Sequence, residues 1–225
     1  NGISFLAVII ALFLIRINNL GNNKNNTALK DLKDGLKFIQ NNPLILALVI
    51  MVGIMSLFGI SYVILMPIFA NEILKVGVKG MALLMSASGF GALVGALILA
   101  RLGDFQYKGK FLVLSSLIFS VSLTLFSVSK TYLLSIITLI FIGGGSVAAI
   151  ALINTILQTK VPDAFRGRVM GVFLLTFAGM MPFGNLIAGG IAQSLGVSFA
   201  VLISGIICTA SFVIINIVYP DIRNI

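Results

Sequence analysis

Long apolar segments, separated by short polar ones, follow one another along most of the chain. A membrane-spanning helix needs about 20 mostly apolar residues, so each long segment predicts one span. Six such segments are Leu44–Ala70, Met81–Ala100, Phe111–Val128, Leu133–Leu157, Val169–Leu195 and Val197–Tyr219. The pattern therefore predicts an all-α membrane protein with a six-helix bundle over residues 44–219 and a short tail at 220–225.

A shorter apolar run, Ile3–Ile15, precedes these segments and ends at Arg16. A signal peptide begins with basic residues and ends in a small-residue cleavage site, and this run has neither feature. We expect residues 1–17 to be the end of a further span whose beginning lies upstream of the sequence.

Residues 18–43 form the longest polar segment and predict a cytoplasmic linker. Within Ala28–Ile39, apolar residues recur at helical spacing, at Leu29, Leu32, Leu36 and Ile39. One interpretation is an amphipathic helix on the cytoplasmic leaflet, with its lysines near anionic headgroups. A solvated linker helix fits the pattern equally well, and both interpretations separate two groups of spans.

The basic residues indicate the orientation. Cytoplasmic loops of membrane proteins are enriched in Lys and Arg. Alternate polar segments, counted from Arg16 to Arg223, hold twelve of the 15 basic residues, and the intervening loops hold three. This alternation predicts a cytoplasmic C-terminus and cytoplasmic loops at residues 101–110 and 158–168.

Composition agrees with a membrane protein and excludes several other classes. Hydrophobic residues make up 59% of the 225 residues, charged residues only 9%, and the mean hydropathy is +1.16. The net charge of +9 is spread over loops without an aromatic-rich basic patch, so we expect the lipid bilayer and no nucleic acid as partner. Histidine is absent and Cys208 is the single cysteine, so we expect no metal and no cofactor.

Small residues mark places where helices pack closely or bend. Gly91 and Gly95 lie four residues apart on one helical stripe, which is typical of close helix packing in lipid. Two further elements are Gly143-Gly144-Gly145 within one span, and Pro182 with Gly179 and Gly184 on either side of it in another. Each is interpreted as a hinge or as a tight packing point, with neither alternative favoured.

Two cytoplasmic loops carry a more specific pattern. The first reads Asp104-Phe-Gln-Tyr-Lys108-Gly-Lys110, and the second reads Val-Pro162-Asp-Ala-Phe-Arg166-Gly-Arg168-Val-Met-Gly. With the glycine-rich segments Gly179–Gly184 and Gly189-Gly190, the chain resembles the major facilitator superfamily, in particular the bacterial group that includes enterobactin exporters and macrolide-efflux proteins.

This resemblance implies the C-terminal six-helix half of a twelve-helix fold, plus the end of span six. It also implies a secondary transporter that moves a small amphipathic molecule, such as a drug or siderophore, across a bacterial plasma membrane by alternating access. The N-terminal half of the same chain would be the partner of this bundle. No charged residue falls clearly inside a span here, so a proton-coupling site is expected in that other half.

The cytoplasmic loops supply a hypothetical gate. Asp104 can pair with Arg166 or Arg168, and such a pair would hold one conformation until transport breaks it. Lys108 and Lys110 belong to the same loop charges. The alternative is that these cations only fix the topology.

Two helical stripes are hypothetical substrate surfaces. Met51, Met55, Phe58 and Tyr62 form one, and Ser146, Ile150, Asn154 and Gln158 form the other. Methionine and aromatic side chains adapt to bulky ligands, although such stripes also pack against neighbouring helices. Asn154 is notable because an amide in lipid needs a partner or water.

Two other classes of protein are alternatives to the transporter. The membrane domain of an ATP-driven exporter requires a nucleotide domain, and the sequence has no Gly-x-x-x-x-Gly-Lys-Ser/Thr string. A membrane-embedded enzyme would show polar catalytic groups in or beside its spans, and the sequence offers neither histidine nor a carboxylate pair. We therefore expect a transporter without enzymatic activity.

Overall fold

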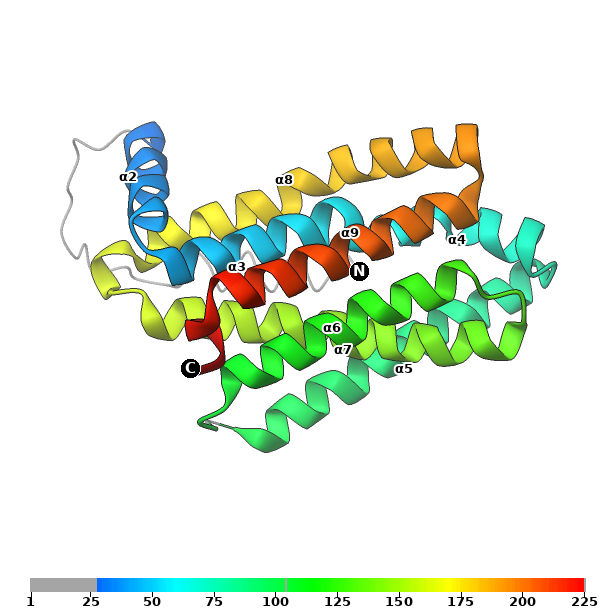
Figure 1. The fold of residues 1–225 in the computed structure, drawn as a ribbon, viewed down its shortest axis with the longest axis horizontal. Helices are drawn as coiled ribbons and strands as arrows, with labels where there is room; N and C mark the ends of the chain where they lie inside the picture. Colours follow the sequence, from blue (N-terminus) through cyan, green and yellow to red (C-terminus); the bar gives the residue numbers. More distant parts are fainter. Residues whose placement is uncertain (1–27, 104, 225) are drawn as a thin grey trace, which may run out of the picture.

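The computed structural model describes residues 28–103 and 105–224; the expected span within residues 1–17 and the first part of the linker lie outside them. The described residues form helices and no strands, which confirms the all-α fold (Figure 1). The elements are α2 (Ala28–Gln40), α3 (Pro43–Ile54), η1 (Met55–Gly59), α4 (Tyr62–Ile68), η2 (Phe69–Ile73), α5 (Gly77–Leu102), α6 (Lys108–Ser127), α7 (Tyr132–Lys160), α8 (Asp163–Leu195), α9 (Val197–Val218) and η3 (Pro220–Asn224).

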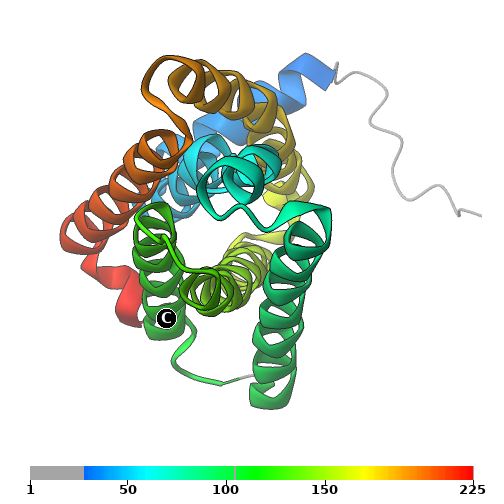
Figure 2. The same ribbon diagram turned by 90° about the vertical axis from the view of Figure 1, so that its right-hand side faces the viewer.

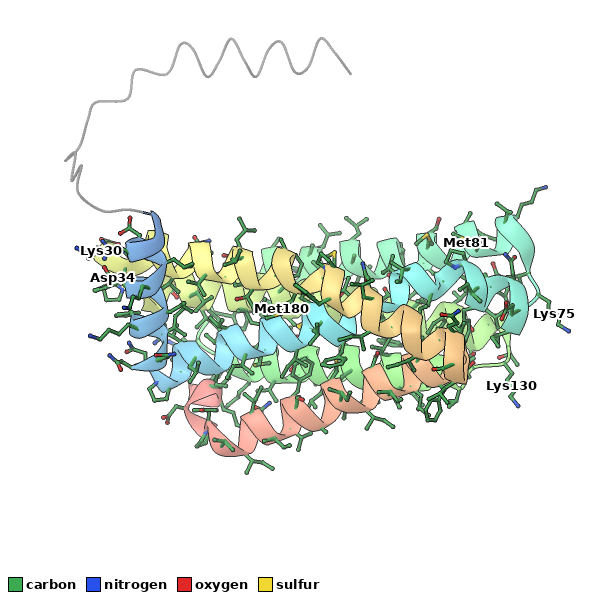
Figure 3. The ribbon with its side chains drawn as sticks, turned by 90° about the horizontal axis from the view of Figure 1, so that it is seen from above. Lys30, Asp34, Lys75, Met81, Lys130 and Met180 are labelled. Atoms are coloured by element: carbon green, nitrogen blue, oxygen red, sulfur yellow. The ribbon has the colours of Figure 1, made fainter. Side chains whose placement is uncertain are left out.

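Six helices within the described ranges are long and apolar enough to cross a membrane, and the first of them is the continuous unit Pro43–Ile73. The long helices lie side by side, and charged residues are found at both ends (Figure 3). Lys30 and Asp34 lie at one end, and Lys75 and Lys130 lie at the other. The charges thus bracket an apolar layer of helices, as a bilayer requires.

Helix α8 begins at Asp163, six residues before the expected start at Val169. Pro162 with extended backbone precedes the helix and Asp163 lies in its first turn, and both features favour a helix start. The 33 residues of α8 extend roughly 50 Å at 1.5 Å per residue, which exceeds the thickness of the hydrocarbon core. The polar first turns of α8 therefore extend beyond the length that the hydrocarbon core requires, at the end of the bundle where α2 packs.

The first span is not a regular α-helix. It contains two π-helical segments, η1 and η2, closed by hydrogen bonds from the Ile60 N–H to the Met55 carbonyl (2.9 Å) and from the Leu74 N–H to the Phe69 carbonyl (3.1 Å). Pro67 lies between them within α4 and removes a further backbone donor. π-helical turns often occur at functional sites, and here they change the helical phase along the span.

Helix α7 is the centre of one half of the bundle, because α5 and α6 both pack against it (Figure 2). Within the apolar 18-residue stretch of each helix, only 17% of the residues of α5 and of α8 are buried, compared with 50% in α6 and α7. Helices α5 and α8 therefore keep large apolar faces that the described residues do not cover.

Candidate functional site

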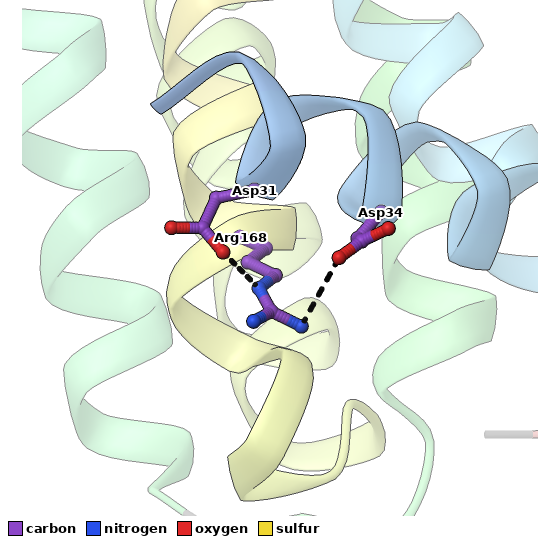
Figure 4. Close-up of polar contacts among 3 residues, drawn as sticks. All are labelled: Asp31, Asp34 and Arg168. Atoms are coloured by element: carbon purple, nitrogen blue, oxygen red, sulfur yellow. Dashed lines mark hydrogen bonds and ion pairs between the residues drawn. The ribbon is translucent and has the colours of Figure 1, made fainter. Parts of the chain in front are cut away.

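One end of the bundle, predicted from the sequence to be cytoplasmic, holds a contact between α2 and the start of α8. Arg168 of α8 donates a hydrogen bond from Nε to Oδ1 of Asp31 over 2.9 Å (Figure 4). Its Nη1 lies 3.9 Å from Oδ2 of Asp34, one turn further along α2. The Arg168 side chain is only 28% exposed, so its charge is partly removed from water and is compensated by these two carboxylates.

Apolar groups complete this contact. The rings of Phe38 and Phe165 stack with centroids 4.5 Å apart, and the Arg168 guanidinium lies 5.7 Å from the Phe165 ring centroid. Gly35 of α2 faces the Arg168 backbone so closely that a Cβ at Gly35 would lie 3.1 Å from the Arg168 carbonyl oxygen. We call this set the α2–α8 contact; its members are Asp31, Asp34, Gly35, Phe38, Phe165 and Arg168.

The sequence predicted α2 but not its partner. Asp31 and Asp34 are three residues apart and so share one helical face, which is the signal that could have indicated a cationic partner. That the partner is Arg168, 137 residues from Asp31, follows only from the fold. The face of α2 that contacts α8 carries Asp31, Gly35 and Phe38, whereas Leu36 of the predicted apolar stripe is 43% exposed. The position of α2 relative to a leaflet remains a prediction.

The other predicted gate residues have more local contacts. Arg166 pairs with Asp163, three residues earlier, with 2.6 Å between Nη1 and Oδ1. The Lys110 ammonium lies 4.8 Å from the Tyr107 ring centroid, and Lys108 is the first residue of α6. Asp104 lies outside the described residues, so its predicted pairing with Arg166 or Arg168 stays a prediction.

The predicted substrate stripes differ in exposure. Met55 lies in η1 and is fully buried, while the Tyr62 hydroxyl lies 3.3 Å from the Ser88 hydroxyl of α5 and its ring contacts Phe126 edge-on. Ser146 and Asn154 of α7 are half-buried. The side-chain oxygen Oδ1 of Asn154 accepts a hydrogen bond from Nε2 of Gln158 over 2.8 Å. The α7 stripe thus retains polar groups at a partly open surface.

The predicted hinge or packing glycines mostly lie at close backbone contacts. A Cβ at Gly91 would meet the Ile140 carbonyl, and one at Gly143 would meet the Ser88 carbonyl. Close helix contacts also involve Gly95, Gly144 and Gly145. The absence of side chains lets α5 and α6 approach the α7 backbone.

In α8 the glycines differ from one another. Gly184 lies against the Leu57 carbonyl of η1, whereas a Cβ at Gly179 would meet only the tip of Leu175 at 3.9 Å. Pro182 lies inside α8 on its exposed side. A hydrogen bond of 2.5 Å from the buried Ser56 hydroxyl to the Phe177 carbonyl also joins η1 to α8, and no sequence pattern predicts it. Bending at these positions remains a prediction.

These features define a polytopic α-helical membrane protein with a partly polar helix face and a charged contact at one end. Comparison with known families identifies it further: residues 1–223 match the family model described as transmembrane secretion effector, of the major facilitator type. The chain therefore belongs to this family of the major facilitator superfamily, which confirms the predicted resemblance.

Named relatives are exporters. The chain is 26% identical over 186 residues to the enterobactin exporter EntS of Escherichia coli O1:K1, and equally to those of Escherichia coli O45:K1 (strain S88) and Shigella boydii serotype 18. Each match covers 80% of this chain and 44% of the relative, so the chain spans about half the length of these exporters. No solved structure matches the chain.

Proposed function

We propose that this chain supplies the C-terminal six-helix half of a secondary transporter that exports a small amphipathic molecule by alternating access. The observation that carries the proposal is the family match over residues 1–223 together with six described membrane-length helices. The matched relatives are exporters, which supports transport over catalysis. Enterobactin, the substrate in their name, is the first ligand to test.

The uncovered faces of α5 and α8 support an interface with an N-terminal half. Leu97 of α5 is 59% exposed, and Phe183 and Leu186 of α8 are 62% and 74% exposed. Exposed apolar side chains such as these can contact either lipid or another part of the protein. The polar α7 stripe is different, because the Ser146 hydroxyl bonds only within its own helix, to the Gly143 carbonyl, and Asn154 only accepts from Gln158, which leaves the amide donors of Asn154 to be satisfied. A cavity between two halves would give these groups water or substrate.

The α2–α8 contact is proposed as part of the cytoplasmic gate. Alternating access moves one helical bundle relative to the other about the substrate site. Helix α2 lies in the linker between the two proposed halves, and Arg168 attaches it to the cytoplasmic end of α8. Docking of α2 would therefore couple the linker to the position of α8, and Asp104 would add to the same charge network.

Secretion by living cells tests the proposed function. In a bacterium that makes enterobactin but lacks its exporter, expression of the full-length protein should restore enterobactin to the medium. The Asn154→Leu variant should restore less, at equal abundance in the membrane, because the cavity loses its amide. If the unsubstituted protein reaches the membrane and neither enterobactin nor amphipathic drugs leave the cells faster, the proposed function is wrong.

A further inference from the structure

A cleft lies beside the α2–α8 contact, at the end of the bundle that is predicted to be cytoplasmic. Its volume is about 380 Å³, within the range of about 300–1,000 Å³ that small-molecule sites occupy. Both helices contribute to its lining, which consists of Asp34, Lys37, Phe38, Asn41, Phe165 and Arg168. An ammonium, a guanidinium and an amide are found among these six residues. The cleft therefore has the polar character of a site for a charged ligand.

Arg168 presents hydrogen-bond donors to the cleft that its two carboxylate neighbours do not use. Its Nε donates to Asp31 over 2.9 Å, which orients the guanidinium plane (Figure 4). The distance of 3.9 Å from Nη1 to Oδ2 of Asp34 is longer than a hydrogen bond, for which the limit is about 3.2 Å. Neither Nη1 nor Nη2 of Arg168 donates a hydrogen bond to another described residue. Two such terminal nitrogens match the spacing of phosphate oxygens.

The last turn of α2 provides the other donors. Asn41 directly follows α2, and its backbone N–H donates to the Lys37 carbonyl over 3.1 Å, so both residues lie on one helical face. A helix C-terminus ordinarily repels an anion, because its last carbonyls lack partners. Here the Phe38 carbonyl accepts a hydrogen bond of 2.6 Å from Nδ2 of Asn42, and the Lys37 carbonyl accepts the bond from Asn41. The turn is thus less repulsive to an anion than an uncapped helix end.

Cations outnumber carboxylates around the cleft. Lys30 and Lys33 lie seven and four residues before Lys37, so the three exposed lysines share one face of α2. With Arg168, they bring four positive charges against the two carboxylates of α2. Helix α2 lies across the direction of the long helices, at their end (Figure 1). A helix at the headgroup level of a bilayer has this orientation.

We propose that this cleft binds the phosphate group of a phosphate ester, with Lys37, Asn41 and the terminal nitrogens of Arg168 as its donors. A phosphate has oxygens on several sides, so it can accept hydrogen bonds from both walls of the cleft. Anionic phospholipids and soluble phosphate esters both carry this group, and the orientation of α2 favours the lipid. The bound phosphate joins α2 to α8 at a second point, beside the bond from Arg168 to Asp31.

Hydrogen exchange of the full-length protein tests the site without any transport measurement. The protein is placed in phosphatidylcholine nanodiscs with or without phosphatidylglycerol, and exchange of the α2 amide hydrogens is followed by mass spectrometry. Phosphatidylglycerol should slow this exchange about fivefold. In a second arm, glycerol phosphate is added to pure phosphatidylcholine nanodiscs, with potassium chloride of equal ionic strength as the control. Protection in the first arm alone identifies a lipid ligand, and protection in the second arm identifies a site that soluble esters reach.

Matched variants assign the protection to the cleft. Lys37→Gln should remove most of it, whereas Lys37→Arg and the control Lys160→Gln, an exposed lysine at the same end of the bundle, should keep it. Asp34→Asn should have the opposite effect and increase the protection, because the carboxylate of the lining no longer repels the phosphate. Each variant is compared with itself in the two lipid mixtures, so that loosening of α2 by the substitution itself cancels. Arg168 is left in place because its loss would detach α2 without any ligand.

Three results would overturn the proposal. The first is exchange of α2 that neither phosphatidylglycerol nor glycerol phosphate slows. The second is equal protection in Lys37→Gln and in the unsubstituted protein, because the charge of the membrane surface would then act on α2 without the cleft. The third is weaker protection in Asp34→Asn. An unchanged elution volume on size-exclusion chromatography shows that each variant is folded.

Discussion

Asp31 and Arg168 are 137 residues apart in sequence, and a hydrogen bond of 2.9 Å joins their side chains. The pair connects the linker helix α2 to the start of α8, and the stacked rings of Phe38 and Phe165 lie beside it. Because the pair combines a charge-assisted bond with apolar burial, α2 is held in one orientation on the bundle.

Removal of the Arg168 charge should loosen α2 from α8. The side chains of Arg168, Asp31 and Asp34 are all partly exposed, at 28% to 41%, so the loss of stability is expected to be about 1 kcal/mol or less. The Arg168→Gln variant should therefore exchange the amide hydrogens of α2 about two- to fivefold faster. Arg166→Gln is the matched control, because Arg166 pairs only locally with Asp163 among the described residues. Equal acceleration in both variants would contradict the role assigned to Arg168.

Gly35 should be intolerant of a larger side chain. A Cβ there would lie 3.1 Å from the Arg168 carbonyl oxygen and 3.2 Å from its Cβ, so the γ carbons of valine would force the helices apart. The Gly35→Val variant should increase the distance between spin labels on α2 and α8. Gly167→Val, where nothing lies within 4 Å of the added Cβ, should leave that distance unchanged. An unaltered distance in the Gly35 variant would show that the contact is loose.

Substitution of Gly143 should destabilise the α5–α7 pair. An alanine Cβ would meet the backbone carbonyl of Ser88, which cannot move as a flexible side chain can. By analogy with overpacked cores, Gly143→Ala should lower the free energy of unfolding by about 1–3 kcal/mol, measured by detergent titration of the purified protein. Gly189→Ala has open space around it and should be neutral or slightly stabilising. A Gly143 variant as stable as its control would refute close packing at this site.

The sequence predicted the spans well because a bilayer imposes a simple requirement, a long apolar segment for each helix. It also predicted α2 from the spacing of Leu32, Leu36 and Ile39. The carboxylate partners of Arg168 could not be found in this way, because hydropathy carries no information about which helix ends meet. The π-helical turn at Met55 could not be predicted either, because hydropathy does not distinguish a π-helical turn from an α-helical one.

The Asn154 side chain should contribute to substrate binding. Replacing the half-buried amide with leucine removes a polar group from the proposed cavity and leaves Gln158 without its acceptor. The Asn154→Leu variant should raise the transport KM about tenfold with little change in maximal rate, as expected when a hydrogen bond to the bound ligand is lost. Thr155→Leu, on the adjacent exposed position, is the control. A fall in maximal rate at unchanged KM would assign Asn154 to conformational change instead.

Directional transport by the reconstituted full-length protein is the most direct test of the account. Inside-out membrane vesicles that contain it should accumulate labelled enterobactin or an amphipathic drug against a gradient when they are energised. Vesicles without the protein should not, and collapse of the ion gradients should release the accumulated substrate. Equal uptake by both kinds of vesicle, for every substrate in a panel of siderophores and amphipathic drugs, would contradict the assignment as an exporter.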